Sequence, residues 1–260
     1  MYSVTNRVDM IKQPRGGYLK CGLFVKEEYS DDVVLNKNEN IEASIVGMAV
    51  DYLTRYMSCA KCADCFGISL MGARLLDLHN NSKHKEIDKA YSYIDMINSL
   101  DDKSIVNTCK LVGYDVCCRA SCDDYRSKGL EPDEFTISNI RNMVNRALLF
   151  FEREGGITET NITFEGGYTD IISSGDADYL TSNGLWDMKA TKYELNANYT
   201  LQLLIYYLLG LRSNNDKFNT VEKIGFFNPR RNICYWVDTS FIPESVISIV
   251  SREVIGIDIL

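Results

Sequence analysis

The chain has 260 residues, 45% hydrophobic and 25% charged, which is typical of a folded globular protein rather than a disordered one. No segment approaches the roughly 20 consecutive apolar residues that a membrane-spanning helix needs, so no membrane partner is expected. The formal net charge of −8 argues against a protein that coats duplex nucleic acid through a broad basic surface. A local cluster of Lys and Arg can nevertheless attract a polyanion.

Two further features concern the cellular compartment. Residues 1–17 lack the apolar region of a secretory signal, which predicts a cytoplasmic protein. Nine cysteines, an odd number, then predict reduced thiols rather than a disulfide framework. Six of them have a spacing similar to that of metal ligands: Cys59, Cys62, Cys65, Cys117, Cys118 and Cys122. Neither histidine lies near them in the sequence, so we expect cysteines without a metal, with zinc or an iron–sulfur cluster as the alternative.

Residues 40–154 have helical periodicity. An apolar residue recurs at each turn of a predicted helix over residues 40–57: Ile41, Ile45, Met48 and Tyr52. Residues 66–130 predict two or three shorter helices, joined by polar stretches at 79–85 and 101–103. A long apolar stripe that begins at Ile137 predicts another helix, which ends at Gly155-Gly156.

From residue 157 onward the pattern is that of strands. We expect strands at 161–168, 177–181 and 185–191, an apolar helix at 199–209, strands at 223–227 and 233–237, and a closing helix at 243–255. This order predicts an α/β fold with a mixed β-sheet flanked by helices. We expect one domain over residues 1–260, with a core of about 156–260 plus the helix 40–57 and a helical insertion of about 58–155.

The most informative stretch is 175–190, GDADYLTSNGLWDMKA. Asn183-Gly184 is the strongest short-range signal for a hairpin with a two-residue type I′ turn. In that register Asp178 lies opposite Lys189. Paired residues point to the same face, and strands have a period of two. Asp178, Asp187 and Lys189 are therefore predicted to converge on one face of the sheet.

These residue types suit metal-dependent chemistry. Two neighbouring carboxylates repel each other unless a cation lies between them, and their hard oxygen atoms suit Mg²⁺ or Mn²⁺. Such an ion can polarise a phosphodiester and lower the pKa of a bound water. Lys189 could orient or deprotonate that water, or hold the phosphate as a point charge. The alternative interpretation is an ordinary cross-strand ion pair on a surface hairpin.

The predicted helix after the hairpin contains Gln202 and Tyr206, which lie one turn apart on one face. Three motifs thus follow in order: Gly175-x-x-Asp178, Asp187-x-Lys189 and Gln202-x-x-x-Tyr206. Together they resemble the RecB-type branch of the PD-(D/E)XK nuclease superfamily over roughly residues 161–230 plus one upstream helix. The resemblance implies an α-β-β-β-α-β core in which Gln202 and Tyr206 position the substrate or the lysine.

The resemblance also concerns the upstream helix. RecB-type enzymes carry a histidine that helps to bind metal in a Gly-x-x-(x)-His turn of the first core helix. The similar stretch here begins at Gly47, and Asp51 stands where that histidine would be. A carboxylate is an acceptable ligand for Mg²⁺. Asp51 is therefore expected to complete the metal site, with Glu42 as the alternative.

The resemblance implies a Mg²⁺- or Mn²⁺-dependent nuclease that hydrolyses phosphodiester bonds in DNA rather than RNA. The alternative is a non-enzymatic interaction protein, such as a phage or mobile-element factor, that uses a nuclease-like scaffold to bind a protein partner. The set of Asp178, Asp187 and Lys189 favours the enzyme. The acidic net charge and the missing histidine favour the scaffold.

Overall fold

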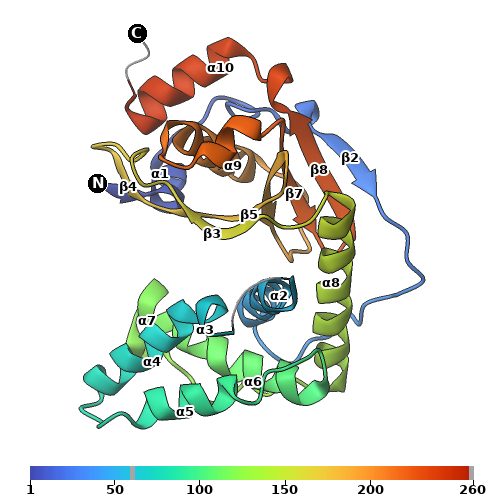
Figure 1. The fold of residues 1–260 in the computed structure, drawn as a ribbon, viewed down its shortest axis with the longest axis vertical. Helices are drawn as coiled ribbons and strands as arrows, with labels where there is room; N and C mark the ends of the chain where they lie inside the picture. The colour runs from blue at the N-terminus through green and yellow to red at the C-terminus, as the bar shows by residue number, and fades with distance from the viewer. Residues whose placement is uncertain (59–61, 258–260) are drawn as a thin grey trace. The chain divides into compact units, whose positions relative to one another are not determined.

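Residues 1–58 and 62–257 are described by a computed structural model, coloured along the chain in Figure 1. The chain forms two units, each with its own internal contacts: unit 1 comprises Met1–Ser30 and Phe150–Leu260, and unit 2 comprises Asp31–Leu149. None of the helices in the described ranges combines the length and the apolar character that crossing a membrane requires.

Unit 1 is built on a mixed β-sheet. In the described part of the chain this sheet has six strands: β2 (Val25–Glu28), β3 (Glu159–Thr163), β5 (Asp176–Leu180), β6 (Gly184–Met188), β7 (Lys223–Asn228) and β8 (Ile233–Asp238). Their order is β2-β8-β7-β6-β5-β3, in which β6 and β7 are parallel and the other neighbours antiparallel. A separate parallel pair joins β1 (Tyr2–Ser3) to β4 (Ile172–Ser174). The expected α/β class with a mixed sheet is confirmed.

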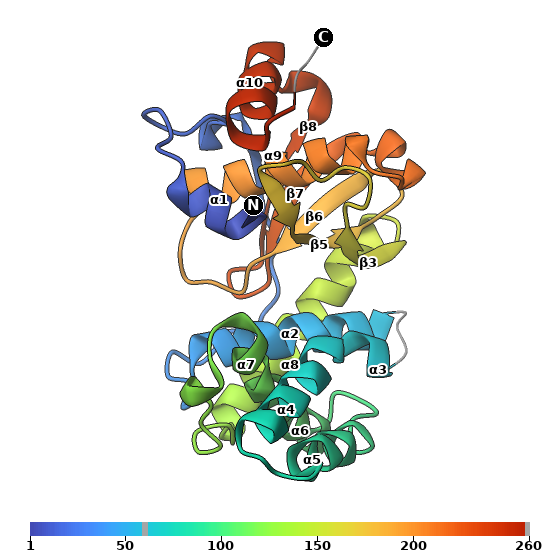
Figure 2. The same ribbon diagram turned by 90° about the vertical axis from the view of Figure 1, so that its left-hand side faces the viewer.

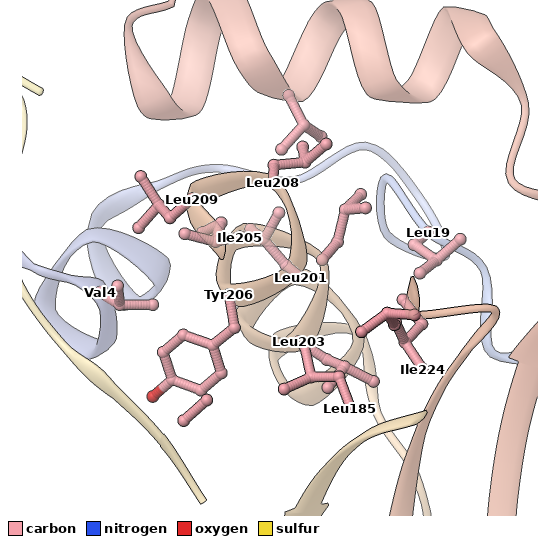
Figure 3. Packing of buried hydrophobic residues seen from close by; sticks show 14 of the residues in the cluster. Val4, Leu19, Leu185, Leu201, Leu203, Ile205, Tyr206, Leu208, Leu209 and Ile224 are labelled. Carbon is pink, nitrogen blue, oxygen red and sulfur yellow. The ribbon is translucent and has the colours of Figure 1, made fainter. Parts of the chain in front are cut away.

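Helix α9 (Ala197–Arg212) packs against this sheet. Two other segments contact α9: helix α1 (Val4–Met10) and the π-helical segment Val250–Ile255, which continues α10 (Glu244–Ile249). Helix α9 contacts β6 and β7 and lies beside α1 (Figure 2). Figure 3 shows Leu203 of α9 next to Leu185 of β6 and Ile224 of β7. All three are fully buried, and burying such a side chain contributes roughly 1.5–3 kcal/mol relative to exposure.

The opposite face of the sheet carries aromatic side chains. Phe150, in the last turn of α8, stacks on Phe227 of β7 with ring centroids 4.2 Å apart, and its edge meets Trp186 of β6 at 5.0 Å. Phe151 packs on Tyr179 of β5 at 4.4 Å. Trp186 and Asp187 are adjacent in β6 and so point to opposite faces.

Unit 2 is helical in its described residues. Its helices are α2 (Ala43–Ser58), α3 (Cys62–Cys65), α4 (Gly67–His79), α5 (Lys85–Ile94), α6 (Asp102–Val112), α7 (Val116–Arg119) and most of α8 (Glu134–Arg153). The predicted polar joint at 79–85 is confirmed, since residues 80–84 connect α4 to α5, whereas of the joint predicted at 101–103 only Asp101 lies outside α6. Asp101 caps α6 by accepting from the Ser104 backbone N–H, and Asp77 accepts from the Glu86 and Ile87 backbone N–H groups at the start of α5.

Helix α2, which the sequence groups with the core, lies in unit 2, where it packs against α6. Two features differ from the expectations. Strand β2 and helix α1 are not among the predicted elements. The prediction that all cysteines are reduced is wrong for Cys117 and Cys122, which form a disulfide because the chain reverses between them and brings their Cα atoms within 4.2 Å. Cys59 and the Cys62 side chain lie outside the described residues.

Candidate active site

The hairpin that carries the candidate site differs from the prediction in its strand register and in the conformation of its turn. Leu180 pairs with Leu185, and Tyr179 with Trp186, so the predicted register is wrong by two residues. Asn183 and Gly184 do not adopt the positive φ of a type I′ turn. The reason is the neighbouring strand: the Asn183 carbonyl accepts from two backbone N–H groups at the start of β7, and so ties the turn to the sheet.

The even shift leaves the predicted face intact, since only an odd shift moves side chains to the other side of a sheet. Continuing the observed pairing by one residue places Asp178 opposite Asp187. The Asp178 carboxylate accepts from the Met188 backbone N–H at 2.9 Å. The Lys189 Nζ lies 3.1 Å from Oδ1 and 2.9 Å from Oδ2 of Asp187. The structure thus brings the two carboxylates and the lysine together.

Burial sets the electrostatics of this cluster. Asp187 is only 2% exposed, whereas the Lys189 side chain is 30% exposed. Burial by itself would lower the pKa of Lys189, but the carboxylates of Asp187 and Asp178 oppose it and hold that pKa above its usual value. Lys189 is therefore a cation at neutral pH in this arrangement. Its Nζ also lies 5.9 Å from the centre of the Tyr199 ring.

Helix α9 places two polar side chains beside the carboxylates. The Gln202 Nε2 donates to the Tyr206 hydroxyl at 2.9 Å, which is the one-turn contact that their spacing predicts. Tyr206 is buried, and its ring extends from α9 toward the side on which Val4 lies (Figure 3). Burial, reinforced by the charges of Asp187 and Asp178, raises the pKa of Tyr206 well above its usual value. The hydroxyl therefore stays protonated and can donate a hydrogen bond.

The glycine of the first motif has a steric role. A Cβ atom at Gly175 would lie 2.6 Å from the Val4 Cγ2 and 3.7 Å from the Tyr206 Cε1. The Gly175 carbonyl also accepts from the Tyr168 hydroxyl at 2.8 Å. Helix α1 is thus part of the wall of the site, which sequence reasoning missed. Ser3 could have indicated the start of this helix in the sequence, because its side chain caps α1 by accepting from the Asn6 backbone N–H.

Asp51 and Glu42, the two candidates for a third metal ligand, belong to unit 2 rather than to unit 1. Asp51 lies on α2 in unit 2, where Arg55 approaches it with Nε at 3.1 Å from Oδ1 and Nη2 at 2.5 Å from Oδ2. Glu42 is exposed in the same unit, and its carboxylate accepts from the Ser44 hydroxyl. Within residues 1–58 and 62–257, no group of three or more His, Cys, Asp and Glu side chains is arranged to hold a metal ion. A third protein ligand for the metal, Asp51 or alternatively Glu42, stays a prediction.

The donor set that is present nevertheless fits a hard divalent cation. Mg²⁺ is commonly held by one or two carboxylates, with water and substrate phosphate as its other ligands. Asp178 and Asp187 supply two carboxylates from adjacent strands on one face of the sheet. Neither thiol nor imidazole takes part in this cluster, which makes it unlike a zinc site.

Basic residues lie where the strands of the site end. Lys192 is exposed three residues after Lys189, and the Arg230 Nε donates to the Ala190 carbonyl at 3.2 Å. Arg231 is engaged differently, since it forms an ion pair with Glu194 and lowers the pKa of that carboxyl to about 2. Lys192 is thus close to Lys189 in the chain, and Arg230 contacts the backbone next to Lys189, in a protein with an acidic net charge.

Comparison of the chain with models of protein families, with curated proteins and with solved structures finds no significant match.

Proposed function

We propose that this chain is a metal-dependent nuclease of the PD-(D/E)XK kind that hydrolyses phosphodiester bonds in DNA. The observation that carries the proposal is the cluster of Asp178, Asp187 and Lys189, next to Tyr206 and on one face of the sheet. An ordinary surface ion pair does not need a buried carboxylate or a second carboxylate opposite it. The succession β3, β5, β6, α9, β7 also has the β-β-β-α-β order of the core that the resemblance implies, once β4 is set aside.

The roles of the residues follow from their positions. Asp178 and Asp187 would hold a Mg²⁺ or Mn²⁺ ion, which when bound supplies a Lewis acid for the phosphodiester and an acidified water. Lys189, as a cation with 30% of its side chain exposed, would hold a phosphate oxygen or orient the attacking water. The protonated Tyr206 hydroxyl, fixed by Gln202, would donate to a second oxygen. Lys192 and Arg230 would attract the phosphate backbone.

The test is cleavage of single- and double-stranded DNA and RNA with Mg²⁺ or Mn²⁺. Lys189→Ala and Asp178→Asn should each lower the rate by ~10²–10⁴-fold, as expected when a positioned group is lost from the chemical step. Asp170→Asn, which changes an exposed carboxylate elsewhere in unit 1, is the matched control and should cleave like the wild type. Circular dichroism of each variant shows whether it is folded.

Metal binding is tested separately by calorimetric titration with Mn²⁺. Affinity should fall strongly in Asp187→Asn and stay unchanged in Asp170→Asn. Equal affinity in all three proteins would place the metal elsewhere. Wild-type protein that cleaves none of the four substrates with either metal would favour the non-enzymatic scaffold instead.

A further inference from the structure

A pocket of about 470 Å³ opens between α1 and the first turns of α9. Two of its lining residues also belong to the candidate active site. Gln202 lines the pocket and donates to the Tyr206 hydroxyl, and Tyr199 lines it while its ring lies 5.9 Å from the Lys189 Nζ. A ligand in this pocket would therefore be an immediate neighbour of a phosphate held by Lys189.

The chemistry of the lining is that of a site for a flat polar ring. Tyr199 offers an aromatic surface, and Asn198, Thr5 and Gln202 offer amide and hydroxyl groups. Gln13 donates from Nε2 to the Asn198 Oδ1 at 2.9 Å, which fixes this amide and leaves its amino group as a donor. Positioned polar groups of this kind fix the orientation of a ligand in small-ligand sites.

The pocket is poorly suited to phosphate. Among the residues that the structure describes, no lysine or arginine lines it, and its one charged lining residue there is Asp9. The start of α9 offers little to an anion, because Asn196 caps it by accepting from the Asn198 and Tyr199 backbone N–H groups. A carboxylate is instead an acceptor for an amino group, such as N4 of cytosine.

We propose that this pocket is a nucleobase subsite that takes one unpaired base of a single-stranded nucleic acid next to the scissile phosphate. The base stacks on Tyr199, and Asp9 accepts from its exocyclic amino group. Cytosine is therefore favoured over thymine, which has a carbonyl oxygen at the same ring position. The proposal rests on the proposed nuclease function for the neighbouring phosphate. A paired base cannot enter, because its edge and both faces are already occupied in a duplex.

The test is the binding of labelled (dC)12 and (dT)12, followed by fluorescence anisotropy in EDTA so that no strand is cleaved. The wild type should bind (dC)12 about tenfold more tightly than (dT)12, the scale of one hydrogen bond to a charged acceptor. Asp9→Ala should bring that ratio close to one. Asp216→Ala, which removes an exposed carboxylate from a different pocket of unit 1, should leave it unchanged. Tyr199→Leu should weaken binding of both strands to a similar extent.

Several results would overturn the subsite: equal binding of the two strands by the wild type, an unchanged ratio in Asp9→Ala, no strand binding, or binding of free dCMP without binding of the strand. Failure of the nuclease proposal is distinguishable from these. Base discrimination that depends on Asp9 in a protein without cleavage activity would count against the nuclease and support the subsite. Metal-dependent cleavage with no base preference would do the reverse.

Discussion

Replacing Lys189 by methionine should destabilise unit 1 far more than the loss of a surface ion pair would. The methionine keeps most of the aliphatic stem but leaves the Asp187 carboxylate, 2% exposed, without its cation. Removing one partner of a buried pair costs about 3–5 kcal/mol, and an exposed pair contributes about 0–1 kcal/mol. Because the Lys189 side chain is 30% exposed, we expect a loss of about 2–4 kcal/mol, measured by urea unfolding at pH 7 in EDTA.

Two further variants decide whether the reasoning holds. Lys217→Met removes the lysine of an ion pair whose side chains are 52% and 32% exposed, and should cost less than about 1 kcal/mol. The double variant Asp187→Asn/Lys189→Met should recover much of the loss, because no buried charge is then left alone. A Lys189→Met protein that loses no more stability than Lys217→Met would refute the assignment of a buried ion pair.

Three other predictions follow from contacts in the two units. Tyr52→Phe should lower the free energy of unfolding by about 1.5–3 kcal/mol, because the Tyr52 hydroxyl donates to the buried Asp115 carboxylate; urea unfolding measures it. Gly175→Ala should cost about 1–3 kcal/mol and weaken Mn²⁺ binding, since its methyl group would lie 2.6 Å from an α1 side chain; unfolding and calorimetry check both. The exposed Cys118 should be alkylated at pH 8 well before Cys109, whose pKa burial raises to about 12; peptide mass spectrometry resolves the order.

The elements that bury one apolar face could be predicted from the sequence, and those that bury little could not. Helices α8 and α9 carry long apolar stripes because each covers a face of a core, and both were predicted within a few residues. All four residues of β2, Val25–Glu28, are exposed. This edge strand is held by backbone pairing with β8, which leaves no alternation of apolar and polar residues to recognise.

For the candidate site, the face that its residues share could be predicted from the sequence, but the turn of the hairpin could not. A strand period of two made the shared face of Asp178, Asp187 and Lys189 insensitive to the error of two residues in the hairpin register. The turn type depended on contacts from outside the hairpin, because β7 engages the Asn183 carbonyl. The local preference of Asn-Gly for a type I′ turn does not reflect contacts with a strand more distant in the sequence.

The burial of Asp187 could not be predicted from the sequence. It decides whether Asp187 and Lys189 form a weak surface ion pair or a strongly interacting one. On an exposed hairpin, the same aspartate and lysine would attract each other weakly through water and contribute little to stability or chemistry. Helix α9 covers this face, so the carboxylate lies in a medium of low effective dielectric, where charges act more strongly on each other and on an incoming phosphate. The same burial makes the lysine a contributor to stability. Stability and activity should therefore respond together to Lys189, and only a variant that removes both charges can separate them.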